Sequence, residues 1–336
     1  MQLENNTINY VFYVITMSTL AITKSVFFER FIPEDMIEAA VSIECTQKRL
    51  ALQDALNTNE TERARTKIEE YRGVLEKIIK LLENNRSKTV LKEQPQFDWT
   101  WGTGSHMSSC WRWEKLMTYA VGYDINMASA MSKATNGKFK EASQMFNQAG
   151  EYCVSIVDNV LPEWQWMEKS SIHMTMENFW KSKVYFIYAM KDLMTVQYGI
   201  TQGQGLSDKN VIRIVSRIEG LCKKSIADWS NHDNSGLMNW ARAARAIYTA
   251  RGHAEKDEFG KAIGLVQDWN TVLTRLVNDN HLNIIMEQLV VALREITDQV
   301  EDWKVTNTHV HFAPIETPEL AEIEQYDEIK NKINSL

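Results

Sequence analysis

The sequence predicts a mainly α-helical protein. Only 14 of its 336 residues are Gly and 5 are Pro, which is too few for the many turns that a β-rich protein of this length requires. Several segments repeat apolar residues at the three- and four-residue spacing of an amphipathic helix. Hydrophobic residues make up 44% of the chain and charged residues 24%, a composition typical of a soluble globular protein with a large core.

The helices are predicted from apolar spacing together with start and stop signals. Pro33 and its acidic neighbours indicate the entrance of the first helix, which continues through Leu56. Thr58 or Asn59 could cap the second helix, and the two are expected to form an antiparallel hairpin. The apolar face of the second helix is Ile68, Tyr71, Val74, Leu75, Ile78 and Leu82. Further helices are expected at about residues 108–133, 137–161, 168–200, 211–229 with Ser207 as N-cap, 237–254, 257–277 and 282–302.

A small β-sheet is predicted from strands near the two ends of the chain. Residues 8–22 are rich in Val, Ile, Tyr, Phe and Thr, which favour strands, and they fall short of the ~20 apolar residues of a spanning helix. Membrane insertion of this stretch remains the alternative. Residues 97–105 indicate a short strand or loop, and the apolar run 308–315 indicates the final strand.

An internal echo predicts how the helices stack. Large and small residues alternate in the same way in two helices, at Phe139, Ala142, Phe146 and Ala149 and again at Phe259, Ala262, Val266 and Trp269. Alanine at such positions allows a neighbouring helix to approach closely, as in the second helix of a tetratricopeptide (TPR) repeat. The echo therefore indicates a divergent, TPR-like helical solenoid.

Charge and cysteine spacing exclude several classes of function. A net charge of -7 argues against a nucleic-acid partner. The four cysteines, Cys45, Cys110, Cys153 and Cys222, form no CxxC pair, so neither a zinc site nor a disulfide framework is predicted. No cofactor is expected.

No catalytic constellation is apparent, because the Gly-containing segments lack the residues of a phosphate-binding loop and no nucleophile elbow occurs. His309 and His311 would share one face of the final strand and could join a metal site, but two half-exposed strand histidines are the favoured interpretation. Glu168, Glu177, Asp192 and His173 contain no ExxH pair, and we interpret them as solvated helix faces. The sequence therefore predicts no enzyme.

The order of several short motifs resembles the BRO1 domain. A strand segment FDWTW precedes a helix that starts with Trp113, Glu114 and Lys115. The next family helix is matched by Ala142, Phe146, Gln148, Ala149, Gly150 and Tyr152, and a later one by Phe259, Gly260, Ala262, Ile263 and Leu265. The family's C-terminal strand is matched loosely by Asn307, Val310, His311, Ile315 and Pro318.

The resemblance implies a curved, TPR-like helical solenoid with a small β-sheet formed by the N-terminal and C-terminal strands. It implies one BRO1-like domain over residues 1–318, with residues 319–336 as an acidic C-terminal tail. The implied function is that of a non-catalytic scaffold or adaptor, which binds an amphipathic helix of an ESCRT-III subunit of the Snf7/CHMP4 type. Its implied location is cytoplasmic, at endosomal membranes, with membrane contact only through the partner.

The resemblance also implies a groove for the partner helix on the helices that begin after about residue 188. We nominate Met194, Val196, Ile212 and Val215 as its apolar lining. The alternative function is that of a structural subunit in a large organellar or cytoskeletal assembly. It is motivated by the 11 Trp, which are interpreted first as core residues and would indicate a permanent interface if several were exposed together.

Overall fold

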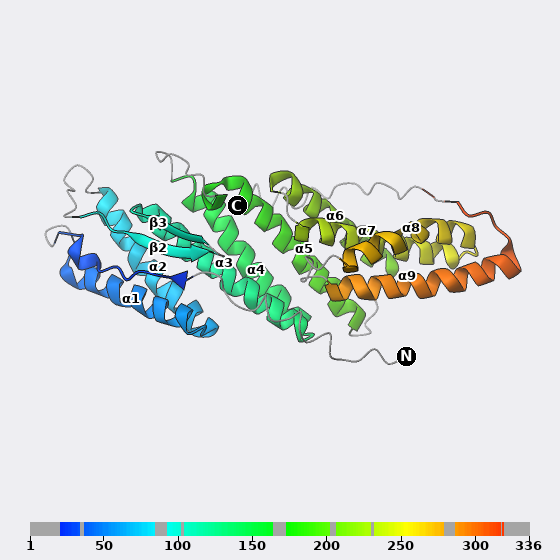
Figure 1. The fold of residues 1–336 in the computed structure, drawn as a ribbon, viewed down its shortest axis with the longest axis horizontal. Helices are drawn as coiled ribbons and strands as arrows, with labels where there is room; N and C mark the ends of the chain where they lie inside the picture. Colours follow the sequence, from blue (N-terminus) through cyan, green and yellow to red (C-terminus); the bar gives the residue numbers. More distant parts are fainter. Residues whose placement is uncertain are drawn as a thin grey trace. The chain divides into compact units, whose positions relative to one another are not determined.

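The computed structural model describes residues 21–33, 37–84, 93–101, 104–163, 173–201, 206–229, 232–278, 286–316 and 318 (Figure 1). Within these ranges the chain is mainly helical, as predicted, with one three-stranded antiparallel sheet. The chain forms two compact units. Unit 1 comprises Met1–Asn136 and Gln144–Trp180, and unit 2 comprises Gly137–Ser143 and Lys181–Leu336. One domain over residues 1–318 stays a prediction.

The helices of unit 1 confirm the predicted segments. They are α1 (Ala39–Asn57), α2 (Thr61–Asn84), α3 (Trp111–Thr135) and most of α4 (Phe139–Ser155). The predicted apolar face of α2 is buried throughout, because α1 packs on one side of it and α3 on another. A π-helical turn, Ile156–Val160, extends α4 until shortly before Pro162, which cannot continue a helix.

The sheet belongs to unit 1. Its strands are β1 (Ala21–Ile22), β2 (Phe97–Trp101) and β3 (Gly104–Ser108), in the order β1-β2-β3. Strand β2 pairs with β3 over its whole length and with β1 at its far end. Of the two interpretations of residues 97–105, strand or loop, the strand is confirmed by β2 and by the start of β3. The predicted N-terminal strand is confirmed for β1, while residues 8–20 lie outside the described residues.

The predicted C-terminal strand is wrong. Helix α9 (Met286–Thr306) continues into a π-helical turn, Asn307–His311, so the third strand of the sheet is β3. The side chain of Asn307 holds the turn, because it donates to the carbonyl of Ala313 at 2.8 Å and accepts from its amide at 3.0 Å. The β-forming residues of 308–315 favour a strand locally. Packing against α8 and the two hydrogen bonds between Asn307 and Ala313 favour a helical turn instead.

Unit 2 is a stack of helices that are consecutive in sequence. After a 3₁₀ turn at His173–Thr175, the helices are α5 (Glu177–Thr201), which enters the unit at Lys181, then α6 (Asp208–Asp228), α7 (His232–Ala254), α8 (Phe259–Asn278) and α9. Each of α6, α7 and α8 packs on the next, and α7 also touches α9, which is the packing expected of a helical solenoid. The small residues of the echo, Ala142, Ala149 and Ala262, are fully buried.

The same tight turn joins helices at two places. After α1, Asn59 adopts the left-handed conformation (φ 56°), while the amides of Glu60 and Asn59 donate to the carbonyls of Ala55 and Leu56. After α7, Asp257 (φ 62°) has the same geometry and the same pair of hydrogen bonds. This is the Schellman motif, so Thr58 and Asn59 end α1 and do not cap α2. Gly137 (φ 71°) stands at the matching position between α3 and α4.

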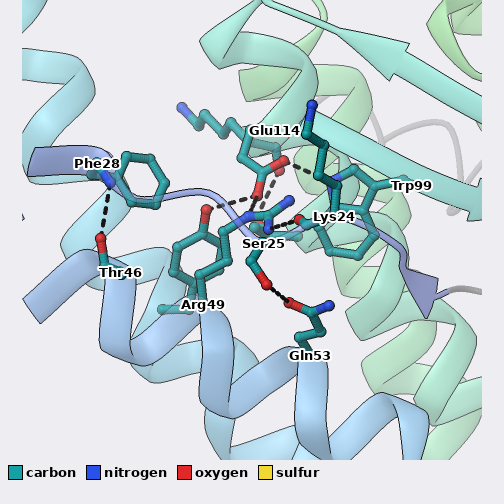
Figure 2. A network of polar contacts seen from close by, with 11 residues as sticks. Lys24, Ser25, Phe28, Thr46, Arg49, Gln53, Trp99 and Glu114 are labelled. Carbon is teal, nitrogen blue, oxygen red and sulfur yellow. Dashed lines mark hydrogen bonds and ion pairs between the residues drawn. The ribbon is translucent and has the colours of Figure 1, made fainter. Parts of the chain in front are cut away.

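A buried carboxylate, that of Glu114 in α3, joins the layers of unit 1 (Figure 2). One of its oxygens accepts from Arg49 Nε of α1 at 2.8 Å and from the hydroxyl of Tyr71 of α2 at 2.7 Å. Its other oxygen accepts from the indole nitrogen of Trp99 of β2 at 2.6 Å. The side chains of Arg49 and Glu114 are both fully buried. Three helices and the sheet therefore share one anion.

The same arginine fixes the segment between β1 and α1. Arg49 Nη1 donates to the carbonyl of Lys24 at 2.7 Å, and Ser25 donates to Gln53 one helical turn along (Figure 2). The amide of Phe28 donates to Thr46 at 2.9 Å. Burial of Tyr71 beside the Glu114 carboxylate raises the pKa of its hydroxyl well above the usual value, so the hydroxyl remains a hydrogen-bond donor. The buried contacts of Arg49, Tyr71 and Glu114 therefore serve the structure of unit 1.

We expect Glu114→Gln to lower the free energy of unfolding of unit 1 by about 3–5 kcal/mol, because it leaves the Arg49 charge buried and unpaired. Urea denaturation followed by tryptophan fluorescence measures the loss. The control is Glu62→Gln, since the Glu62 side chain is 79% exposed in its pair with Arg65 and should change stability by less than about 0.5 kcal/mol. A loss at Glu114 no larger than that of the control would contradict this account.

Candidate protein-binding surface

The pairing of α5 with α6 shows where the nominated groove residues lie. Ser182 near the start of α5 is hydrogen-bonded to Ser225 near the end of α6, with 2.9 Å between the hydroxyl oxygens. Further along, Asp192 of α5 pairs with Arg217 of α6. The two helices are therefore antiparallel, and continuing this register places residue 196 about level with residue 212.

The four nominated residues lie at about the same height along the α5–α6 helix pair, but three of them are buried. Met194, Val196 and Val215 are buried at 0–2% exposure. Ile212 is half-buried, so it is the nominee whose side chain a partner can reach directly. Tyr198 and Ile200 on the last turns of α5 are 41% and 49% exposed, and they add accessible apolar surface at the same end of the helix pair.

Asp192 was expected on a solvated face, and that expectation is wrong. Its side chain is buried, and burial raises the pKa of the carboxyl even though Arg217 opposes that shift. The pairing with Arg217 provides the contact that a buried carboxylate needs. Glu177 begins α5, and Glu168 lies outside the described residues.

A second, more exposed charge cluster lies where α6 meets α7. One carboxylate, Glu219, forms ion pairs with three cations: Arg242 at 2.9 Å, Lys223 at 3.0 Å and Arg245 at 3.2 Å. The Glu219 side chain is 6% exposed, whereas Lys223 is 59% and Arg242 33% exposed. None of the three cations has a second carboxylate partner in the part of the chain that the structure describes. The cluster therefore carries two positive charges in excess.

The electrostatics of Glu219 follow from this crowding. Burial alone would raise the pKa of its carboxyl, but the hydrogen bonds from Arg242 and Lys223 and the charge of Arg245 outweigh burial and hold the pKa below the usual value. Glu219 is therefore ionised at neutral pH. Sequence reasoning missed this cluster, because its members are up to 26 positions apart. The local signals are the i,i+4 pair of Glu219 and Lys223 and the two arginines among small residues in ARAARA.

A part-exposed stripe runs along α7 beside this cluster. It consists of Met238, Arg242, Arg245 and Thr249, whose four- and three-residue spacing places them on one face of the helix. Asn234 donates to Ser225 at 2.6 Å, so α6 and α7 are antiparallel and Ile212 is level with about Thr249. We call these four residues, with Ile212, Glu219 and Lys223 of α6, the α6–α7 seam. It is apolar at both ends and cationic in its middle.

The buried cysteines and the two histidines near the end of α9 have structural surroundings. Burial raises the pKa of the Cys45 thiol, and it raises that of Cys222 to about 12, so neither is a nucleophile at neutral pH. His309 and His311 lie on the π-helical turn and not on one strand face, and the His311 ring packs on Phe259 with 4.7 Å between ring centroids. In the described ranges no group of three or more His, Cys, Asp or Glu side chains could hold a metal ion.

A membrane span was the alternative interpretation of the N-terminal apolar stretch. Residues 8–20 of that stretch lie outside the described residues, and the remaining two form β1. Among the helices that the structure describes, none has the length and apolar character needed to cross a membrane.

Comparison with known proteins identifies the fold. No protein-family model matches the sequence, and no curated protein matches it. Among solved structures, one reported as the structural basis for endosomal targeting by the Bro1 domain aligns with 96% of this chain and 95% of its own, at a TM-score of 0.61 and 10% identity.

Two ALIX structures align as well. The ALIX BRO1–CHMP4C complex covers 93% of this chain and 92% of the matched chain, at a TM-score of 0.70 and 10% identity. ALIX in complex with a late-domain peptide of SIVmac239 covers 93% of this chain, at a TM-score of 0.69 and 11% identity, and this chain spans about half of that longer one. The chain therefore has a BRO1-like fold, as its motif order predicts.

We expect Glu219→Gln to lower the free energy of unfolding of unit 2 by about 1–3 kcal/mol at pH 7, because it removes the charge shared by three cations. The folded-state pKa of Glu219 is below the unfolded value of about 4.5. Its stabilisation is therefore complete above that pH and is lost as the pH falls through the folded-state value.

Urea titrations of wild type and variant between pH 7 and pH 3 measure this difference, which should shrink below pH 4.5. Glu255→Gln, at an exposed position after the end of α7, is the matched control and should change stability by less than about 0.5 kcal/mol. A Glu219 effect that stays constant down to pH 3 would show that charge is not its cause.

Proposed function

We propose that this chain, whose fold is BRO1-like, is a non-catalytic scaffold that docks an amphipathic helix of another protein. The observation that carries the proposal is the accessible surface of unit 2: Tyr198 and Ile200 are exposed at the end of α5, and on the α6–α7 seam the half-buried Ile212 and Met238 lie on either side of a cluster with excess positive charge. An amphipathic helix presents apolar residues at i, i+3, i+4 and i+7, with charged residues beside them. The surface of unit 2 and an amphipathic helix therefore both combine apolar and charged side chains.

The partner we propose is an ESCRT-III subunit of the Snf7/CHMP4 type. Two observations support it: the resemblance of the motif order to the BRO1 domain, and the similarity of the fold to ALIX BRO1 in complex with CHMP4C. A role at endosomal membranes, reached through that partner, is supported by the similarity to a Bro1 domain described in terms of endosomal targeting.

Within the proposed groove, the four nominated residues have different roles. Ile212 is accessible and would contact the partner helix directly, with Tyr198 and Ile200 at its edge. Met194, Val196 and Val215 are buried and would support the groove from beneath. Residues that dominate binding lie in well-packed pockets from which water is excluded, and Tyr is among the residue types most often found there.

The second candidate is a fixed subunit of a large assembly. Its tryptophan argument needs several exposed Trp side chains, and the described ones are buried or half-buried; Trp99, Trp113 and Trp180 lie in the core. A different feature favours it: Val310, Phe312 and Ile315 after α9 are 64%, 75% and 52% exposed. Stoichiometric co-purification of the native protein with one large complex would support this candidate over a free adaptor.

We expect Ile212→Asp to weaken binding of a fluorescein-labelled peptide with the C-terminal amphipathic helix of a Snf7/CHMP4-type subunit by about tenfold or more, because a charge enters an apolar contact. Fluorescence anisotropy measures the affinity. Ile200→Asp, at an exposed position, is the second variant and should act in the same direction without affecting folding.

Ile43→Asp is the matched control, since Ile43 lies on α1 of unit 1 and is similarly exposed at 44%. It should leave the affinity unchanged. If the wild-type chain does not bind the peptide, or if all three variants bind it equally well, the proposed groove is wrong.

A further inference from the structure

The segment of the chain that contains the α6–α7 seam is basic, although the chain as a whole is acidic. Residues 177–254, which include α5, α6 and α7, contain 11 Lys and Arg against 6 Asp and Glu, a net charge of +5. The whole chain has 37 Lys and Arg against 44 Asp and Glu, a net charge of -7. An excess of one sign on one part of a protein attracts segments of the opposite charge, so this part of unit 2 favours an acidic partner.

The seam also has a defined order of apolar and charged groups along α6. Ile212, Glu219 and Lys223 are separated by seven and four residues, which places all three on one face of the helix. At 1.5 Å per residue, Glu219 stands about 10 Å beyond Ile212 along the helix axis, which is about two turns. Arg242 and Arg245 of α7 pair with Glu219 at that level. The apolar contact and the cationic contact are therefore two turns apart.

The cations at this level have hydrogen-bond donors that Glu219 does not use. A guanidinium has five N–H donors, and Arg242 donates to Glu219 through its Nε. In the ranges that the structure describes, Arg242 pairs with no other carboxylate, and the Nε of Arg245 is buried without a hydrogen-bond partner. Lys223 pairs with Glu219 while its side chain is 59% exposed. A second carboxylate could therefore bind here without displacing Glu219.

We propose that the helix docked on the seam presents an acidic side chain two turns from its apolar anchor. The anchor contacts Ile212, and the acid pairs with Lys223 and Arg242, which together determine specificity. Seven residues complete nearly two turns of an α-helix, so an anchor and an acid that are seven positions apart stand on one face. The inference rests on the proposed function, because it names the chemistry of the helix that the seam selects.

Selection against other helices follows from the same charges. A neutral side chain at the acid's position would leave the excess positive charge unpaired, and a lysine there would add a further positive charge beside it. Partly exposed ion pairs each change affinity by up to about fivefold, and salt screens them. We therefore expect a preference of moderate size that falls with ionic strength, in addition to the apolar contact at Ile212.

Two synthetic peptides of about 18 residues test the acid separately from the apolar contact. Both are fluorescein-labelled helices based on alanine and glutamine, with leucines at the first, fourth, fifth and eighth positions. One has glutamates at the eleventh and fifteenth positions, seven residues after the second and the fourth leucine, and the other has glutamines there. In fluorescence anisotropy we expect the wild-type chain to bind the glutamate peptide at least about fivefold more tightly at low salt, and less than about twofold more tightly in about 0.5 M NaCl.

Two neighbouring lysines of α6 provide the variant and its matched control. Lys223→Gln should reduce the preference for the glutamate peptide by about half or more, because one of the two cations that meet the acid is removed. Lys224→Gln removes the same charge from the adjacent exposed position, but Lys224 lies over the Tyr185 ring of α5, away from the seam. It should leave the preference unchanged. Both lysine side chains are exposed, so neither substitution should disturb the core of unit 2.

The outcomes separate this inference from the proposed function. Equal affinities of the wild-type chain for the two peptides, or the same loss of preference in the Lys223 and Lys224 variants, would overturn the inference. Peptide binding that Ile212→Asp abolishes would still support the proposed groove in that case. A chain that binds neither synthetic peptide overturns the inference as well, whereas the proposed function fails only if the Snf7/CHMP4-type peptide also does not bind.

Discussion

The carboxylate of Glu114 is the constraint on which unit 1 depends. It accepts hydrogen bonds from α1, α2 and β2 while standing on α3, so the relative positions of three helices and the sheet are set by one group. Removing two charges from water is costly, and a buried pair is weak evidence of net stability. Its value lies in specificity, because a shift of any of these elements would leave Glu114 or Arg49 buried without its partner.

Unit 2 uses a carboxylate in a different way. At Glu114 one cation meets one anion, and both are fully buried. At Glu219 three cations meet one anion, and two of them are substantially exposed. The first arrangement is balanced and closed, which suits a structural role. The second is unbalanced and partly open to solvent, which is the property that the proposed binding role uses, although both consist of the same residue types.

Periodicity predicts a helix most clearly where the helix has a single continuous apolar face, as in α2, where every residue of the predicted face is buried. The failures have specific physical causes. The run 308–315 has strand-forming side chains. Its sequence does not indicate the hydrogen bonds between Asn307 and Ala313 or the packing of α9 on α8. Met194 and Val196 have helical spacing, but spacing does not show that α5 is covered there. Asp192 depends on Arg217, 25 positions away, and Glu219 depends on Arg242, 23 positions away, as well as on the nearby Lys223; no local pattern predicts the two distant partners.

The turns at Asn59 and Asp257 affect how the chain folds. Each closes a helical hairpin with very few residues, so the entropy lost in closing the loop is small and both hairpins can nucleate locally. The contact between Arg49 and Glu114 spans 65 positions, so forming it costs more loop-closure entropy than closing either hairpin. In unit 2 the helices pack mostly on their neighbours in sequence, so the two units should differ in contact order and in folding rate.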